Sequence, residues 1–358
     1  MEWILADTET LILIEKILGT VVFTIVAFFS TQMFIKLLSP KPKTFYGSTR
    51  TRKKLDIIIP AVNINLAIKN TRHLLKCNNV GKIIIVSPSR EGKDGKYIFV
   101  KDGGKGRANA INMGIDYIES PYVLILDEDL FVPISTIRRG ILVLEKYDIV
   151  KLTLLPRHRY TDIFRRLIRI ERLFVETEVI PKSVAHFGGT GFFRSDVLKD
   201  LKFNDAFLTE DIDLTVRAYK KGYSIVSLPD LYAYEEYPSF KGWLIQRRRW
   251  AYGWFQVVRH YIREMKNRKV FGFLYTQLFN FIPILLVPSI FFGNLLPDYA
   301  SIFLSIYCIL PIILTGIKFD KKLSLLYVVY YFFLIFYSSI CSFIPLRRYV
   351  ITPKEGSQ

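Results

Sequence analysis

The sequence has few cysteines and no repetitive segments. Cys77, Cys308 and Cys341 form no even set and show no metal-ligand spacing, which excludes a disulfide framework and a cysteine-rich zinc site. Two of them lie in apolar runs, where cysteine behaves as a small hydrophobic residue. No internal repeat or low-complexity tract interrupts the chain. The cysteine pattern therefore indicates a reduced compartment or a membrane location.

Acidic residues are also scarce. The chain has 32 Asp and Glu against 50 Lys and Arg, which gives a formal net charge of +18. Hydrophobic residues make up 51% of it, and the mean hydropathy is +0.24. These features together are typical of a membrane protein whose polar part lies against anionic lipid. The apolar segments argue against a nucleic-acid partner, and we predict none.

The first apolar segment predicts a membrane anchor. Residues 17–35 carry no charge and are long enough to cross a bilayer. A cleaved signal peptide is the alternative, but the start lacks a basic region and the apolar run is too long. Seven Lys and Arg residues follow between positions 36 and 54, and basic flanks stay in the cytoplasm. We therefore predict an extracytoplasmic segment at 1–16, an anchor at 17–38 and a cytoplasmic domain at 39–240.

The C-terminal third is again apolar. A basic, aromatic helix expected over 241–270 has the composition of helices that lie in the membrane interface. About three membrane segments are predicted between 271 and 346, followed by a tail at 347–358. If all three cross, Arg347 and Arg348 lie outside, against the charge rule, so one segment is expected to be interfacial or re-entrant. The prediction is a multi-pass protein of the cell membrane.

The organising stretch of the polar part is YVLILDED, residues 122–129. An unbroken run of Val, Leu and Ile predicts a strand buried on both faces, as in a parallel sheet. On an extended chain Asp127 and Asp129 would lie on the same side, where two carboxylates hold a divalent ion. The alternative is a plain acidic turn after a core strand. Ligands of open α/β sheets bind beyond such strand ends.

Similar strands alternate with helical patterns along residues 55–265. This alternation predicts an α/β domain with a parallel sheet. The helix at 161–180 either covers the sheet or lies on the membrane, and both positions stay open. Expected strands span 55–59, 82–86, 148–153 and 224–228, and expected helices 108–118, 135–147, 161–180, 207–221 and 243–265.

An ordered set of short motifs accompanies these elements. In chain order they are Asp56, Pro60, Lys105-Gly106-Arg107, Asn109, Asn112, Asp127-x-Asp129, Gly188-Gly189-Thr190-Gly191, Thr209-Glu210-Asp211 and Gln246-x-x-Arg249-Trp250. Over residues 54–261 this order closely resembles the membrane-integrated family 2 glycosyltransferases, which include cellulose, chitin and hyaluronan synthases and glycolipid-forming relatives. Each motif alone is weak, but the ordered set is specific. The resemblance implies a cytoplasmic GT-A-type (Rossmann-like) domain with flanking transmembrane and interfacial helices.

The resemblance also implies a chemistry and a role for each residue. The donor would be a nucleotide-diphospho-sugar, a UDP-sugar by resemblance, and the acceptor a lipid or glycan. Asp211 would be the general base of an inverting transfer, beside Thr209 and Glu210. Mg²⁺ or Mn²⁺ would bind Asp127 and Asp129. The implied nucleotide-sugar-binding residues are Asp56, Pro60, Lys105, Arg107, Asn112, Asp127 and Arg249, and the implied acceptor-binding residues are Gly189, Thr190, Gln246 and Trp250.

Each motif has a structural alternative. Asp211 would be favoured at a helix N-terminus without any catalytic role. Trp250 and its neighbouring arginines are typical of a helix whose side chains extend to the membrane interface. The glycines at 188–191 would also suit an ordinary turn, and Lys105 and Arg107 a solvated loop.

Two turns depart from the family pattern. Ala61-Val62-Asn63 follows the first strand where a Tyr-Asn-acid turn is usual, and Ser87-Pro88-Ser89 follows the second where an Asp normally contacts the base. The preference for uridine is therefore in doubt.

Three functional classes follow. An enzyme is favoured by the intact Asp129, Asp211 and Arg249. The alternative is a non-catalytic membrane scaffold or sugar-nucleotide sensor on a transferase fold. A transporter would show paired intramembrane charges, which are absent from the apolar segments. A polymer synthase needs a channel, which homo-oligomerisation would supply.

Overall fold

The computed structural model describes residues 31, 51–175, 187–264, 266–278 and 298–346. The chain divides into two compact units, Met1–Pro40 with Tyr275–Ile340, and Lys41–Leu274 with Cys341–Gln358. The predicted anchor at 17–38 lies outside the described residues except for position 31, as does most of the predicted segment at 271–296.

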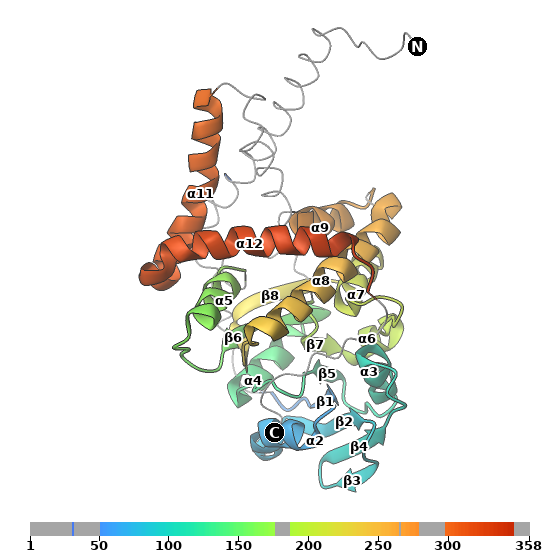
Figure 1. Ribbon diagram of the computed structural model, residues 1–358. Coiled ribbons are helices and arrows are strands. Elements are labelled where there is room, and N and C mark those ends of the chain that lie inside the picture. The colour runs from blue at the N-terminus through green and yellow to red at the C-terminus, as the bar shows by residue number, and fades with distance from the viewer. Residues whose placement is uncertain (1–30, 32–50, 176–186, 265, 279–297, 347–358) are drawn as a thin grey trace. The chain divides into compact units, whose positions relative to one another are not determined.

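The second unit is built on one mixed sheet of eight strands (Figure 1). Their order across the sheet is β3-β4-β2-β1-β5-β7-β6-β8. The strands are β1 (Leu55–Pro60), β2 (Val80–Ser87), β3 (Gly92–Asp94), β4 (Tyr97–Lys101), β5 (Tyr122–Ile125), β6 (Ile149–Pro156), β7 (Gly191–Arg194) and β8 (Ile225–Glu235).

The central strands are parallel, as the sequence predicts. β1 pairs in parallel with β2 and with β5, and β2 pairs in parallel with β4. All four residues of β5 are buried, because both faces of the sheet are covered. The unbroken apolar run at 122–125 therefore reflects a strand with neither face exposed to solvent.

The sheet is mixed and not parallel throughout, so the predicted parallel arrangement is wrong at two strands. β7 runs antiparallel between β5 and β6, and β3 forms an antiparallel hairpin with β4 that the sequence patterns did not indicate. β3 is a three-residue exposed edge strand, too short to show a hydrophobic period. The glycine loop before β7 lies at the edge of the sheet where β5 ends. β7 therefore starts at that edge and runs back along β5 in the antiparallel direction. Ile125 at the end of β5 thus pairs with Gly191 at the start of β7.

Helices cover both faces of this sheet. One face packs a core of Leu55, Ile57, Leu124 and Val150 together with Ala67 of α2 and Ile137 of α4. α3 packs against β1 and β2. The helices of this unit that the structure describes are α2 (Ile64–Thr71), α3 (Arg107–Ile115), α4 (Ile134–Val143), α5 (Ile163–Phe174), α6 (Ser195–Leu201), α7 (Glu210–Lys220) and α8 (Phe240–Tyr261).

α5 packs against α8, and this contact leaves open whether α5 also meets the membrane. Arg247 of α8 donates a hydrogen bond of 2.5 Å to Glu171 of α5, and the ring of Phe164 in α5 meets that of Trp243 edge-on. α5 therefore packs along α8 within the domain. Among the described residues it runs to Phe174, and residues 176–180 of the predicted helix lie outside them.

The later helices are α9 (Arg268–Leu278), α11 (Asp298–Asp320) and α12 (Ser324–Phe343). In the part of the chain that the structure describes, one helical stretch, Ile309–Phe343, contains a segment long and apolar enough to cross a membrane. Core helices of soluble proteins and signal sequences can have the same length and composition, so membrane integration stays a proposal.

Candidate functional site

The acidic turn follows β5 directly. β5 ends at Ile125, and Asp127 to Asp129 form a turn closed by a hydrogen bond from the Leu130 N–H to the Asp127 carbonyl at 3.1 Å. The premise that the two aspartates lie on an extended chain is therefore wrong. The turn still places both at the carboxyl edge of the sheet. Asp129 is buried and Asp127 is partly exposed.

Arg107 joins three of the predicted motifs. It begins α3, and its Nε donates to Asp127 Oδ1 at 2.9 Å. Its Nη1 donates to Glu210 Oε1 at 2.6 Å, and its Nη2 to the Gly189 carbonyl at 2.5 Å. One guanidinium thus holds together the acidic turn, the glycine loop and the Thr-Glu-Asp motif.

The charge of Arg107 is fixed by this arrangement. Burial by itself would lower the pKa of Arg107, but the negative charges of Asp127 and Glu210 outweigh it and raise that pKa above its ordinary value. Arg107 stays a cation, and its fork geometry suits several oxygen acceptors at once. The solvated-loop alternative for Arg107 is wrong. Lys105 is exposed in the loop just before it.

Gly189 brings Asp211 into the same site. Its φ of +83° lies in the left-handed region that glycine favours. A Cβ added there would lie 3.7 Å from Arg107 Nη2 and 3.8 Å from Asp211 Oδ2. The glycine loop therefore passes beside both groups, and a larger side chain would occupy the space between them. Thr190, the next residue, is buried.

Asp211 lies in the first turn of α7. Thr215 fixes the backbone there, because its hydroxyl donates to the Asp211 carbonyl at 2.7 Å and accepts the Phe187 N–H at 3.1 Å. Phe187 precedes the glycine loop, so α7 and the loop are held together. The dipole at a helix N-terminus also stabilises an acid. The position of Asp211 in the first turn of α7 is therefore compatible with a helix-end acid and with a catalytic base.

α8 closes the other side of the Thr-Glu-Asp motif through a glycine that lies outside the predicted motifs. A Cβ on Gly253 would lie 2.6 Å from Thr209 Cγ2 and 3.0 Å from the Thr209 nitrogen. Gln256, one turn further along α8, accepts the Leu208 N–H at 3.3 Å. An isolated glycine inside a helical pattern is a sign of close packing, and this was the available signal.

Helical spacing relates the Gln-x-x-Arg-Trp motif to this contact. Arg249 precedes Gly253 by four residues and Gln246 precedes it by seven, which places all three on one face of α8. We therefore expect Arg249 and Gln246 to share the face that meets Thr209.

Trp250 has a well-defined environment of its own. The guanidinium groups of Arg247 and Arg172 lie 4.8 and 5.5 Å from the centroid of its ring. Arg172 in turn pairs with Glu235 at 2.9 Å. These cation–π contacts tie α8 to α5 and β8, and stacking of Trp250 on an acceptor sugar stays a prediction.

Asp56 has a structural environment rather than a place at this edge. It lies at the amino end of β1 and is 1% exposed. Its two oxygens accept four hydrogen bonds of 2.8 to 2.9 Å, from the N–H groups of Lys82, Glu119 and Ser120 and from the Ser120 hydroxyl. The site proposed below does not include Asp56.

Asn112 also makes contacts within the protein. Its side-chain amide donates to the Phe203 carbonyl and accepts the Phe203 N–H, both at 2.8 Å. We therefore do not assign Asn112 to the nucleotide site. Asn112 instead attaches α3 to the loop that leads to Thr209. Pro60 ends β1 at the carboxyl edge of the sheet, on the side of the predicted nucleotide.

Glu128, the middle acid of the turn, was missed. Its Oε2 accepts the Asn63 N–H at 2.7 Å, and its carbonyl accepts the Asn70 side-chain amide at 2.9 Å. Burial raises the pKa of Glu128. These bonds fix the acidic turn to the β1–α2 connection, so Glu128 positions its two neighbours.

Asp127 and Asp129 supply only some of the ligands that a divalent ion needs. Among the described residues, no group of three or more His, Cys, Asp or Glu side chains could hold a metal. Mg²⁺ and similar ions usually take one or two carboxylates and complete their shell with substrate phosphates and water. Asp127 and Asp129 match that donor set.

Comparison with known proteins gives one family. A model of the family described as glycosyl transferase family group 2 matches residues 122–340. The chain is 26% identical over 282 residues to the probable glycosyltransferase YdaM of Bacillus subtilis (strain 168), which covers 68% of this chain and 67% of that protein. It is 31% identical over 188 residues to glucomannan 4-beta-mannosyltransferase 1 of Oryza sativa subsp. japonica, which covers 48% of this chain and 36% of that relative.

A solved structure shares the fold. Mannosyltransferase PcManGT from Pyrobaculum calidifontis, in complex with GDP-Man and Mn²⁺, has a TM-score of 0.59 at 15% identity, covering 92% of this chain and 98% of that one. The mixed α/β sheet matches the GT-A glycosyltransferases. Because the family model also matches more than half of the sequence, this protein belongs to glycosyl transferase family group 2.

Proposed function

We propose that the protein transfers a sugar from a nucleotide-diphospho-sugar to a lipid or glycan acceptor at the cytoplasmic face of the membrane, with inversion and with the help of a divalent metal. The observation that carries this proposal is the set of contacts of Arg107. They bring the acidic turn, the glycine loop and the Thr-Glu-Asp motif to one edge of the sheet. A non-catalytic sensor would not need Asp211 beside that edge.

The donor diphosphate binds at the carboxyl edge of the sheet. Arg107, Lys105 and, from α8, Arg249 supply positive charge there, and the N-terminus of α3 favours an anion. Asp127 and Asp129 would hold Mg²⁺ or Mn²⁺, which would neutralise charge on the diphosphate of the leaving nucleoside diphosphate. GDP-Man and Mn²⁺ in the PcManGT complex support this class of donor and metal.

Asp211 acts on the acceptor. Its carboxylate takes the proton from the acceptor hydroxyl as that oxygen attacks the anomeric carbon of the sugar. A single displacement inverts that carbon. Glu210, paired with Arg107, keeps the first turn of α7 in place. The lack of a side chain at Gly189 keeps the space between Arg107 and Asp211 unfilled, where the acceptor would approach.

The apolar segments support the proposed acceptor and membrane face. The apolar helix Ile309–Phe343 and the uncharged run at 17–35 support integration in the membrane. About four apolar segments provide less membrane material than a polymer channel within one chain requires. A lipid-linked acceptor or a short glycan product is therefore proposed beside a longer polymer made by an oligomer.

Asp211→Asn tests the proposal. Asn has nearly the shape of Asp but does not accept a proton at neutral pH, so donor affinity should survive while transfer falls. General-base assistance contributes roughly 10²- to 10⁴-fold, or about 3–5 kcal/mol of barrier. The measurement is donor affinity and transfer rate on one purified preparation, with a panel of GDP- and UDP-sugars, Mn²⁺ or Mg²⁺, and membrane lipids as acceptors.

Asp116→Asn is the matched control, because Asp116 is an exposed acid at the far end of α3. It should bind and transfer like the wild type. Transfer by Asp211→Asn within a few-fold of wild type would make Asp211 a helix-end acid only. Donor binding without transfer by the wild-type protein would favour the sensor.

A further inference from the structure

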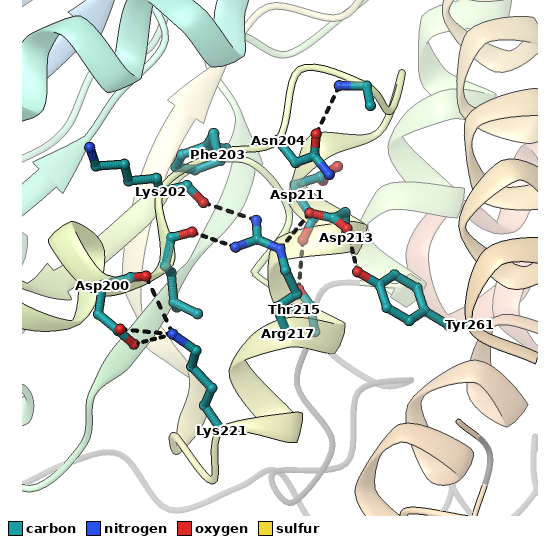
Figure 2. Close-up of polar contacts among 12 residues, drawn as sticks. Asp200, Lys202, Phe203, Asn204, Asp211, Asp213, Thr215, Arg217, Lys221 and Tyr261 are labelled. Atoms are coloured by element: carbon teal, nitrogen blue, oxygen red, sulfur yellow. Dashed lines mark hydrogen bonds and ion pairs between the residues drawn. The ribbon is translucent and has the colours of Figure 1, made fainter. Parts of the chain in front are cut away.

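A buried carboxylate behind the proposed base links α7 to α8. Asp213 is 0% exposed and lies two residues after Asp211 in the first turn of α7. Its Oδ1 accepts the Tyr261 hydroxyl at 2.7 Å, and its Oδ2 accepts Arg217 Nε at 2.7 Å (Figure 2). Tyr261 is the last residue of α8, the helix that carries Arg249.

Arg217 extends the connection to the rest of the site. Its Nη1 donates to the Leu201 carbonyl and its Nη2 to the Lys202 carbonyl, the latter at 2.9 Å (Figure 2). Both carbonyls lie at the end of α6, where a cation is favoured. The next residue, Phe203, is held by Asn112 of α3. Arg107 begins that same helix, so the chain of contacts returns to the site.

The first turn of α7 is thus held from two sides. Glu210 is bound by Arg107 on the side of the donor site. Asp213 is bound by Tyr261 on the side of α8. Asp211 lies between these two residues in the sequence, so its place relative to α8 depends on both attachments.

The chemistry of Asp213 makes the attachment strong. A buried carboxylate requires charged or hydrogen-bonded partners, and removal of one partner is costly. Burial and the hydrogen bond to Asp213 raise the pKa of Tyr261, so the phenol keeps its proton and remains the donor at neutral pH. The ring of Phe207, two residues before Thr209, stacks on that of Tyr261 at 6.3 Å.

We propose that Tyr261 is a positioning residue for sugar transfer, which acts through Asp213 to fix the place of Asp211 relative to α8. The inference rests on the proposed function, because it assigns Asp211 the role of base. It adds a residue outside the recognised motifs whose effect is on the transfer step rather than on donor binding.

Tyr261→Phe is the test, since Phe keeps the ring and removes only the hydroxyl. A displacement of about 1 Å in a reacting group costs on the order of 10²-fold, so kcat should fall by about 10- to 100-fold. Donor Kd should change less than threefold, because the contacts of Arg107 remain. The assay is carried out well below the unfolding temperature, where a merely structural role would leave kcat unchanged.

Tyr223→Phe is the matched control. The Tyr223 hydroxyl donates to Asp200 Oδ2 at 2.8 Å, a bond of the same kind near the other end of α7. This variant should keep the wild-type kcat. Equal kcat values for the two Tyr→Phe variants would overturn the proposal.

A double variant shows whether the hydrogen bond itself is responsible. Asp213→Asn should lower kcat more than Tyr261→Phe, because it also weakens the pair with Arg217. If Tyr261 acts through Asp213, the double variant should have the kcat of Asp213→Asn alone. Multiplying effects would overturn the proposal. The proposed function is tested separately: it stands if the wild type transfers sugar and Asp211→Asn does not, whatever the Tyr261 and Asp213 variants show.

Discussion

At the scale of single residues, the three consecutive acids after β5 have three different surroundings. Asp127 pairs with Arg107, Glu128 accepts a backbone N–H from Asn63, and Asp129 is buried. Residue type alone would treat them as equivalent. Their neighbours distinguish the acid that pairs with Arg107 from the acid that fixes the turn.

Asp56 is a similar case, in which a residue of the motif set has a structural role. Asp56→Asn should unfold more easily, because an amide nitrogen in place of either oxygen leaves two donors without an acceptor. At about 1–3 kcal/mol for an unsatisfied buried group, we expect a loss of roughly 2–4 kcal/mol in the free energy of unfolding. The measurement is thermal or urea unfolding beside donor affinity.

Asp94→Asn is the control, because Asp94 is exposed in β3. It should leave stability unchanged. A donor affinity that falls in Asp56→Asn while stability does not would restore Asp56 to the nucleotide site.

At the scale of elements, the direction of β7 and the packing of α8 create the site. β7 begins at Gly191 beside the end of β5, which places the glycine loop next to the acidic turn. α8 meets the Thr-Glu-Asp motif at Gly253 and Gln256. The residues that make these contacts, Gly191, Gly253 and Gln256, do not themselves react in the proposed transfer. Each brings a neighbouring segment within reach.

Gly253→Ala tests the approach of α8. Alanine favours a helix by about 1 kcal/mol over glycine, but its Cβ would lie 2.6 to 3.0 Å from three atoms of Thr209. Overpacking of this kind typically costs about 1–3 kcal/mol. We expect a net loss of stability and a lower transfer rate, measured by the melting temperature and by kcat.

Gly242→Ala provides the comparison within the same helix. Its Cβ would lie 3.3 Å from Pro238 Cβ, near the exposed start of α8. Stability and transfer should stay close to wild type. A Gly253→Ala variant that is as stable and active as Gly242→Ala would contradict the close contact with Thr209.

At the scale of the whole molecule, charge and hydropathy predict how the chain meets the membrane. The basic block after the first apolar run predicts that residues 39–240 lie in the cytoplasm and the N-terminus outside. In a background without native cysteines, a cysteine at Thr8 should react with an impermeant reagent in intact cells. One at the exposed Ser89 should react only after the cells are permeabilised. The reverse pattern would exclude this topology.

Much of the fold is readable from the sequence because its signals are local. The apolar runs at 55–59, 82–86 and 122–125 are strands, since side chains buried on both faces leave no polar alternation. The motif order indicated a family 2 glycosyltransferase, which the comparison confirms, while its membrane integration stays a prediction. The helix at 207–221 and the helix at 243–265 are also present, with ends shifted by a few residues.

The tertiary structure alone decided which of these residues meet. Arg107 and Glu210 are 103 positions apart, and Tyr261 and Asp213 are 48 apart. No local pattern predicts such pairs, because they depend on how strands and helices pack after each has formed. The same packing buries Asp56 among backbone donors and brings Gly253 against Thr209. The sequence determined the chemical groups available to this protein, and long-range packing determined which of them share an environment.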